Sequence, residues 1–397
     1  MEDEMDEKKF QSVLRAAIES QWDRFPYYRN LCGQEGLGRA DLLMIIDHEE
    51  YHRIPGVVSP AFKLSKGLTG DLNDLSGPGA FQVSSSTSGD PSYIYTSSAE
   101  LARIADRYRL TFGIPGVPKA LAFAPSLRIL RALSKKAGLP GTGKPAILRM
   151  QLALEGGYRH YDQVDVTVDV DLLKTVLGRA VRRPASLRKA SAEDVASILR
   201  DAERSGSPIT IGGVVLLLQP YLALFREGEF HLGANGYIAF SGGGYSGAKG
   251  SIRGDKIDKP RFFADIASIL GIPESDWASH IKDIYGFTET PALCEGRWSP
   301  EYGDFVFRAD PDARLYVVDP ETEAPLRAGR GVLKVIAPSL DARPAAANVS
   351  VLQYDEAEIV TSREDGRIEA FTHVARYQGR GASVEGCAFK AAEIAGL

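Results

Sequence analysis

The order of apolar segments along the chain limits its fold more than any other feature. Through most of the chain, segments with helical spacing alternate with short apolar strands. One predicted helix carries Val195, Leu199 and Ala202 on a single face, and Gly206 ends it before a strand begins at Ile209. Helices that alternate with short buried strands are typical of layered α/β folds. We therefore expect an α/β architecture.

The pattern changes near Trp298, where short apolar strands follow one another with Asp-Pro, Gly-Arg-Gly and Asp-Gly turns between them. Such a run is typical of a curled sheet or a small barrel. The chain is therefore expected to have four parts: a helical entry region over residues 1–80, an α/β core over 81–297, a β-rich, barrel-like subdomain over 298–378, and a tail over 379–397.

Composition excludes several classes of protein. Of 397 residues, 44% are hydrophobic and 25% are charged, as in an ordinary globular enzyme rather than a disordered or fibrous chain. The net charge of −5 gives no attraction to nucleic acid. No apolar run approaches the ~20 residues that span a bilayer, and the acidic start lacks the order of a signal peptide. We therefore expect a cytoplasmic protein without a membrane span.

Two segments could bind phosphate or a flat ligand. The loop of residues 84–92 reads SSSTSGDPS between two apolar strands, and its hydroxyls and Gly89 suit phosphate oxygens. A flexible surface loop is the alternative. The segment 241–249 reads SGGGYSGAK after an apolar strand, and its glycines would let a ligand lie against bare backbone. A strained turn is the alternative there.

Two further segments carry reactive or charged groups. Residues 283–289 read DIYGFTE, so an aromatic ring, a hydroxyl and a carboxylate stand together; a further surface loop is the alternative. Near the end of the chain, Asp355 follows a β segment, and Gly379-Arg380 precedes Cys387. An accessible thiol beside basic residues can act as a nucleophile. Cys32 and Cys294 are interpreted as small buried residues.

Two other segments match the residue letters of known motifs but lack the surrounding sequence that those motifs need. His48-Glu49-Glu50-Tyr51-His52 fits the HExxH pattern of zinc hydrolases, but Pro55 and Gly56 follow at once, so a solvated helix end is the favoured interpretation. The run Gly141–Lys144, GTGK, lacks the spacing of a Walker phosphate loop.

The four segments stand in an order that resembles the adenylate-forming superfamily of acyl-CoA synthetases and peptide-synthetase adenylation domains. SSSTSGDP is similar to its phosphate-binding loop, YGFTE to its aromatic-Gly-x-Thr-Glu motif, and GRGASVEG to a shortened hinge motif, while LQYDE stands where the ribose-binding Asp is carried. The resemblance covers residues 81–397. It is strongest to the LuxE-type acyl-protein synthetases, then to the phenylacetate-CoA ligases.

The resemblance implies a fold of layered α/β subdomains plus a small β-barrel, and a reaction in two halves. A carboxylic acid attacks ATP to give an acyl-adenylate, and a thiol then takes the acyl group. It implies that Ser86, Thr87, Ser88 and Gly89 hold the ATP phosphates, that Gly242, Gly243 and Gly244 flank the adenine and the acyl pocket, and that Tyr285 stacks on the adenine, with Gly286 a further ATP-binding residue. It also implies that Thr288 binds phosphate, Glu289 binds Mg²⁺, Asp355 and Arg380 hold the ribose, and Cys387 accepts the acyl group.

The chain departs from the superfamily pattern after the hinge motif. Relatives carry a lid domain there, with a lysine that contacts the reacting carboxylate, whereas only seventeen residues follow Arg380. We therefore expect the lid domain to be largely missing. Lys249 and Lys144 are candidate substitutes for its lysine. Asp90 stands in the phosphate loop where many relatives have Thr.

Three functions remain open at the level of sequence. The first is an acyl-protein synthetase that loads Cys387 and passes the acyl group to a partner reductase or carrier. The second is a stand-alone ligase that uses coenzyme A or an acyl carrier protein, with Cys387 structural. The third is a binding subunit without activity. The apolar run Val214–Leu218 suits a fatty or aromatic acid but does not identify it.

Overall fold

The computed structural model describes residues 5–63, 79–83, 93–97, 99–104, 107, 119–123, 192–213, 215–219, 222–228, 230–241, 243, 245–246, 248–249, 252–253, 255–339 and 346–377. Its α-helices are α1 (Glu7–Arg24), α2 (Pro26–Gln34), α3 (Arg39–Asp47), α8 (Ala192–Ser205), α9 (Val215–Leu218), α10 (Leu222–Gly228), α11 (Lys259–Ile269) and α12 (Trp277–His280). No helix within these ranges is long and apolar enough to cross a membrane.

The strands are β1 (Val57–Val58), β2 (Gly79–Val83), β3 (Tyr93–Ser97), β4 (Lys119–Phe123), β5 (Ile209–Gly213), β6 (Gly236–Ser241), β7 (Ala248–Lys249), β8 (Ile252–Arg253), β9 (Ile281–Gly286), β10 (Leu293–Ser299), β11 (Asp304–Arg308), β12 (Arg314–Val318), β13 (Arg330–Ile336), β14 (Ser350–Ser362) and β15 (Ile368–Arg376). Short 3₁₀ helices include η1 (Tyr51–Arg53) and η2 (Ser59–Lys63).

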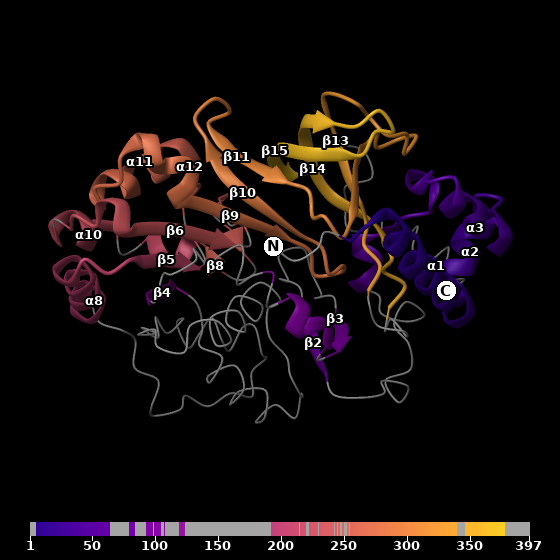
Figure 1. The fold of residues 1–397 in the computed structure, drawn as a ribbon, viewed down its shortest axis with the longest axis horizontal. Helices are drawn as coiled ribbons and strands as arrows, with labels where there is room; N and C mark the ends of the chain where they lie inside the picture. Colours follow the sequence, from indigo (N-terminus) through magenta and orange to yellow (C-terminus); the bar gives the residue numbers. More distant parts are fainter. Residues whose placement is uncertain are drawn as a thin grey trace.

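One large mixed sheet connects the two ends of the molecule (Figure 1). Its order is β12-β13-β14-β15-β11-β10-β9-β6-β5-β4, and β1 pairs with β14. The strands β4, β5, β6 and β9 run parallel, whereas β9, β10 and β11 pair antiparallel. Residue 298, where the sequence changes its pattern, lies inside β10, so the sheet continues from the α/β part into the β-rich part.

The parallel end of the sheet is covered by helices, as a parallel sheet requires. All residues of β5 are buried. Helix α8 packs Val195, Leu199 and Ala202 into the core and ends at Ser205, where Gly206 adopts a φ of 59°. This confirms the predicted helix and its glycine stop. Helices α8, α10 and α11 lie together at this end of the molecule (Figure 1).

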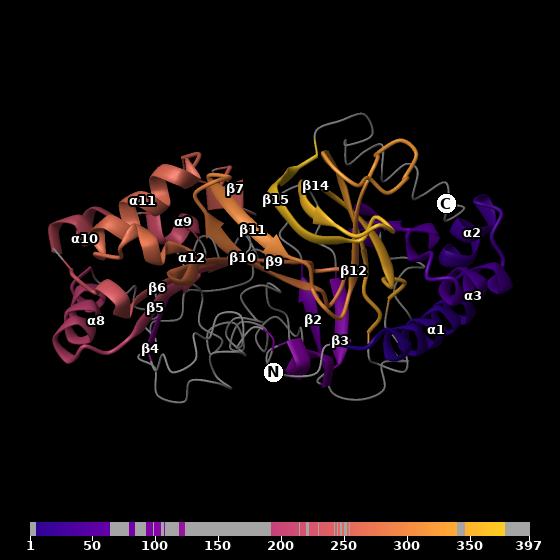
Figure 2. The same ribbon diagram turned by 45° about the horizontal axis from the view of Figure 1, so that its top comes forward.

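The antiparallel end of the sheet curls, as the sequence predicted. Strand β14 is long, and its pairing with β15 shifts register at three places, which lets a long strand bend. A bridge between Tyr316 and Arg367 connects β12 back to the start of β15. The strands β12 to β15 therefore form a curved sheet (Figure 2).

The N-terminal helices pack against this curled sheet rather than standing apart. Asp6 caps α1 by accepting a 2.7 Å hydrogen bond from the backbone amide of Lys9. The helices bury Phe10 and Tyr28 in one cluster with Tyr316 and Ile336 of the curled sheet. The entry region and the β-rich part therefore share a hydrophobic core within the described residues.

Candidate active site

Two of the residues that the sequence singled out meet in space. Tyr285 lies near the end of β9, and Asp355 lies in β14, seventy residues further along the chain. The Tyr285 hydroxyl donates a hydrogen bond of 2.7 Å to Oδ2 of Asp355. Burial, followed by the charge of Asp355, raises the pKa of Tyr285 well above its usual range. The tyrosine therefore stays protonated and acts as a hydrogen-bond donor.

Phenylalanine rings fix the ring of Tyr285 from several sides. Its centroid lies 4.8 Å from that of Phe287, 5.8 Å from Phe307 and 6.0 Å from Phe371, all in edge-on geometry. Phe307 in turn lies over Gly296, where an added Cβ would come within 2.6 Å of the phenylalanine ring. Gly296 therefore makes the space that lets Phe307 support Tyr285.

Arg376 holds the other oxygen of the Asp355 carboxylate. The two residues are direct partners across β14 and β15, and Nη1 of Arg376 donates to Oδ1 of Asp355 at 3.1 Å. A quarter of the Asp355 side chain remains exposed. The carboxylate is therefore oriented by two donors and still accessible from one side, as a group that binds a ligand hydroxyl must be.

The glycine segment reaches the same edge of the sheet as Tyr285. Strands β6 and β9 are parallel, with Ser241 beside Ile284, so their carboxyl ends meet. Gly243 follows β6 and has a φ of 66°, a conformation that favours glycine. Ligands of open α/β sheets bind at the carboxyl ends of parallel strands. Gly243 and Tyr285 therefore occupy the position in which such folds place a ligand.

The predicted phosphate and metal residues lie in the loop after β9. The backbone carbonyl of Glu289 accepts a 2.6 Å hydrogen bond from the Asn348 side chain, which anchors this loop beside the start of β14. Glu289 is buried, and Thr288 is half-buried. No group of three or more His, Cys, Asp or Glu within the described ranges could hold a metal ion. A single carboxylate nevertheless fits Mg²⁺, which is commonly held by one or two carboxylates together with substrate phosphates.

A buried network of charges lies on the same face of β9 as Tyr285. Asp283 accepts a 2.9 Å hydrogen bond from the Tyr245 hydroxyl. Burial raises the pKa of Asp283 to about 6, although Lys259 opposes the rise. Lys259 itself bonds both carboxylate oxygens of Asp304, at 2.7 and 2.8 Å, and His373 lies 3.3 Å from the same group. This network fixes α11 to the sheet beside the site.

Several predicted site residues lie outside the described residues: Ser86, Thr87, Ser88, Gly89, Gly242, Gly244, Arg380 and Cys387, together with Lys144. Their roles remain predictions. Of the acid-pocket segment, Val215 and Leu218 are buried in the core.

The two described cysteines are small buried residues, as the sequence predicted. Cys32 and Cys294 are both buried. Burial raises the pKa of Cys32 to about 12 and that of Cys294 still further. Because a thiolate is the nucleophilic form, neither residue is suited to carry an acyl group near neutral pH.

The HExxH match does not form a zinc site. Helix α3 ends at Asp47, Glu49 has a φ of 59°, and His52 belongs to η1. His48 and His52 are therefore not on one turn of a helix. The favoured interpretation of this segment as a helix end is confirmed.

Sequence reasoning missed the residues that support the site, namely Phe307, Phe371, Arg376 and Asn348. The alternation of Phe305 and Phe307 in β11 was the available pattern, because every second residue of a strand faces the same side. Nothing in the sequence indicated that Arg376 would lie opposite Asp355, since that depends on a register with bulges.

Comparison with known proteins shows the class of fold. The sequence matches no protein-family model, and no curated protein matches it. The described fold is similar to that of a CoA ligase of known structure. A structure of 2-hydroxyisobutyryl-CoA ligase in complex with 2-HIB-AMP, in the postadenylation state, matches with a TM-score of 0.57 at 13% identity, over 92% of this chain and 66% of that one.

The same ligase matches in a second state. Its complex with 2-HIB-AMP and CoA, in the thioesterification state, gives a TM-score of 0.58 at 15% identity, over 94% of this chain and 70% of the other. The chain thus spans about two thirds of the length of the ligase chain in the postadenylation state. At identities this low, the structural match shows a shared fold and nothing more. The sequence resemblance had predicted this fold.

Proposed function

We propose that the protein is an ATP-dependent ligase that converts a carboxylic acid to an acyl-adenylate. The observation that carries this proposal is the contact between Tyr285 and Asp355. It joins the residue expected at the adenine to the residue expected at the ribose, across seventy residues of sequence, at the ligand-binding edge of the sheet. If these two segments were ordinary surface loops, a hydrogen bond between Tyr285 and Asp355 would not be expected.

The described residues have defined tasks in this reaction. Asp355, held by Tyr285 and Arg376, accepts hydrogen bonds from the ribose hydroxyls of ATP, which fixes the α-phosphate for attack. Thr288 donates its hydroxyl to a phosphate oxygen. An oxygen of the substrate carboxylate forms a bond to the α-phosphorus, and the bond to the leaving pyrophosphate breaks.

Charge on the phosphates is the main barrier to such a step, because two anions must approach each other. The serine-rich loop with Ser86, Thr87, Ser88 and Gly89 would supply hydroxyl and amide donors. Glu289 would hold Mg²⁺, which neutralises phosphate charge when bound. The buried position of Glu289 suits a ligand of a bound cation.

For the second half of the reaction, we propose Cys387 as the first acyl acceptor. Cys32 and Cys294 are buried with raised pKa values, which leaves Cys387 as the cysteine available for thioester formation. Its thiolate would attack the acyl carbonyl and release AMP. The acyl group would then pass to a partner reductase or carrier, as in acyl-protein synthetases.

Transfer to coenzyme A is the second candidate. The structural match to a ligase crystallised with 2-HIB-AMP and CoA favours it. The two candidates share the first half-reaction. Incubation with a labelled acid, ATP and Mg²⁺ followed by denaturation separates them: label bound to wild type and absent from C387S supports the cysteine, whereas acyl-CoA formed equally by both proteins supports coenzyme A.

Trapping of the intermediate tests the shared step. A panel of short, fatty and aromatic acids is incubated with the protein, ATP and Mg²⁺, and acyl-AMP is sought by mass spectrometry. At least one acid should give its adenylate. Absence of adenylate with every acid, together with no ATP-induced rise in melting temperature, would contradict the proposal and favour a binding subunit.

A further inference from the structure

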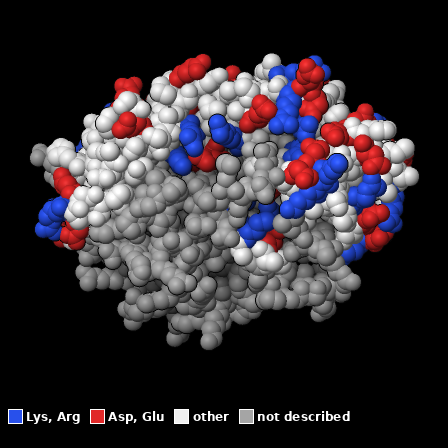
Figure 3. Space-filling model, viewed as in Figure 1, with Lys and Arg blue, Asp and Glu red and all other residues white. Residues whose placement is uncertain are grey.

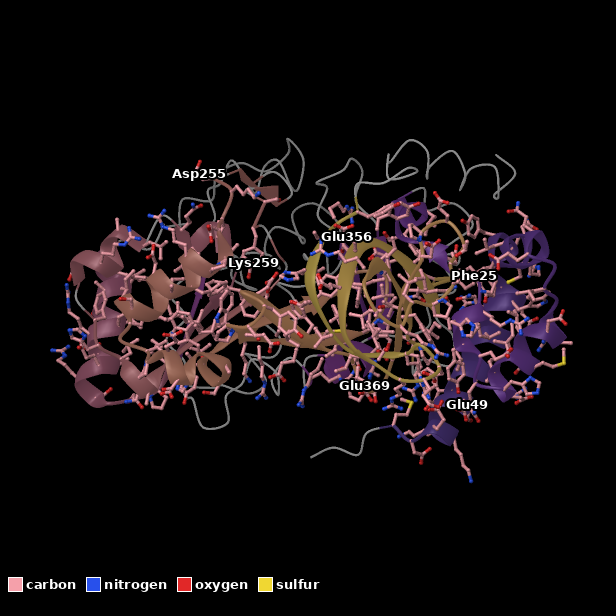
Figure 4. All side chains as sticks on the ribbon, turned by 90° about the horizontal axis from the view of Figure 1, so that it is seen from above. Phe25, Glu49, Asp255, Lys259, Glu356 and Glu369 are labelled. Carbon is pink, nitrogen blue, oxygen red and sulfur yellow. The ribbon has the colours of Figure 1, made fainter. Side chains whose placement is uncertain are left out.

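A pocket of about 930 Å³ opens on the side of the sheet opposite Tyr285. Phe307 faces Tyr285, so the next residue along β11, Arg308, points to the other face. Arg308 lines the pocket together with four further arginines: Arg297, Arg314, Arg363 and Arg367. We call it the arginine pocket. Figure 4 shows Glu369, a residue of its wall, and Glu356 on opposite sides of the curled sheet.

Positive charge exceeds negative charge on the sheet wall of the arginine pocket. Glu295 forms ion pairs with Arg297 at 3.1 Å and with Lys282 at 3.2 Å, and its direct cross-strand partner is Arg308. Arg297 and Lys282 are themselves direct partners across β10 and β9. Like charges directly opposite each other destabilise a sheet. Glu295 therefore forms ion pairs with two of these three cationic residues, and Arg308 is the third.

Arg308 is the member of this group with a free guanidinium. Arg308 is exposed, and its side chain forms no hydrogen bond or ion pair with any other residue that the structure describes. A guanidinium presents five N–H donors in a planar fork, which matches the oxygens of phosphate or carboxylate. Arg308 is therefore available to a ligand without the loss of an existing contact.

The arginines of the opposite wall are paired with carboxylates: Glu369, which also lines the pocket, lies 2.9 Å from Arg363, and Asp365 lies 2.5 Å from Arg367. Glu7 accepts hydrogen bonds from both Arg314 and Arg367, at 3.0 and 3.1 Å. Asp310 also lines the pocket, but its side chain is fully buried, and Arg107 holds it at 2.6 Å. Arg314 and Arg367 thus share Glu7, and the charges of this wall are close to balanced, so the excess of positive charge comes from the sheet wall.

The arginines of the pocket differ in exposure in a way that suits a binding site. Arg314 and Arg367 are held in place, with only 10% and 13% of their side chains exposed, and Arg314 lies 3.8 Å over the ring of Phe10. Arg297 and Arg363 at the rim are about half exposed, at 53% and 52%. Fixed cations preorganise the pocket, while rim cations can close on a ligand. Basic and acidic side chains are interleaved on this face (Figure 3).

We propose that the arginine pocket is a second ligand site, which binds a small molecule carrying phosphate groups. The volume lies within the range of about 300–1,000 Å³ that is usual for small-molecule sites. The pocket is separated from Tyr285 and Asp355 by the sheet, so the bound molecule is distinct from the ATP that the proposed reaction consumes. This inference does not depend on that reaction.

The test uses inorganic pyrophosphate as the probe. Calorimetric titration is performed with a non-hydrolysable ATP analogue present in excess, so that the nucleotide site is filled. Wild type should bind pyrophosphate, and the double variant R308Q/R363Q should bind it roughly tenfold more weakly or worse, because charged hydrogen bonds are lost. The variant should melt like wild type, since the Arg308 side chain has no described hydrogen bond or ion pair and Arg363 loses only an exposed ion pair with Glu369.

The matched control is R200Q/R226Q, which removes two arginines of similar exposure on α8 and α10. It should bind pyrophosphate like wild type. Citrate, a carboxylate of similar charge, should bind more weakly than pyrophosphate. Failure of wild type to bind pyrophosphate, equal loss in both double variants, or citrate binding as tight as that of pyrophosphate would overturn the proposal.

Discussion

The hydroxyl of Tyr285 lies 2.7 Å from Oδ2 of Asp355, although seventy residues separate them in the chain. Tyr285 lies near the end of β9 in the α/β part, and Asp355 belongs to the curled sheet. This hydrogen bond therefore connects the two parts of the molecule at the proposed nucleotide site. Arg376 on the other carboxylate oxygen completes the arrangement.

Removal of this hydroxyl should weaken nucleotide binding while keeping the fold. In Y285F the ring keeps its phenylalanine neighbours, but Asp355 loses one of its two donors. We expect the KM for ATP to rise about three- to tenfold, the effect of one hydrogen bond to a charged group. The control is Y237F. The ring of Tyr237 lies away from the site and stacks on His280, with 4.4 Å between the two ring centroids. Equal KM values for all three proteins would contradict a role for the contact.

The space at Gly296 should be required for stability. In G296A the new methyl group would lie 2.6 Å from the Phe307 ring, so the ring must move away from Tyr285. Overpacking of this kind costs about 1–3 kcal/mol. The midpoint of urea denaturation should fall accordingly. Gly33 in α2 has open space around it, so G33A should leave the midpoint unchanged or raise it. A G296A protein as stable as G33A would argue against the proposed packing.

The buried Asp283 should make stability depend on pH in the acidic range. Its pKa is raised from 3.8 to about 6, mainly by burial, so the folded protein binds this proton more tightly than the unfolded chain does. The free energy of unfolding should therefore fall as pH rises from 3.8 to about 6, by on the order of 2–3 kcal/mol. Thermal melts of wild type and D283N across this range measure the effect. D283N should lack this part of the pH dependence; identical profiles would contradict the assignment.

Glu7 should behave in the opposite sense. Burial alone would raise its pKa, but hydrogen bonds from Tyr51, Arg314 and Arg367 outweigh burial and lower it. Its contribution is therefore present above pH 4.5, the ordinary value, and is lost as pH falls through the lowered pKa. At neutral pH, E7Q should be less stable by about 2 kcal/mol in chemical denaturation, because charged hydrogen bonds weaken. E19Q, which loses one exposed ion pair to Arg39, should change stability little.

The sequence predicted those features that depend on local patterns. Gly206 ends α8 because the left-handed conformation after a helix favours glycine, and that preference is visible in a single residue type. Tyr285 lies near the end of β9 and Gly243 follows β6, where a glycine or polar residue after an apolar run marks the position, whereas Asp355 lies within β14. The motif order then indicated the fold.

Features that depend on pairing between distant strands could not be predicted. Arg376 faces Asp355 only because bulges shift the register of β14 against β15. Phe307 reaches Tyr285 only because a third strand contributes Gly296. Glu7 meets Arg314 across 307 residues, so the arginine pocket has no local pattern in the sequence. The HExxH match is the opposite case. Its local pattern is present, but α3 ends before it, so the two histidines do not share a helix face.

The central claim is that Asp355 binds the nucleotide of an adenylation reaction. The most direct measurement is acid-dependent exchange of labelled pyrophosphate into ATP by wild type and by D355N, with the acid that gives the most adenylate. We expect wild type to exchange, and D355N to lose about 10- to 100-fold in kcat/KM for ATP while it melts within a few degrees of wild type. Equal exchange by both proteins, or exchange that does not require the acid, would contradict the account.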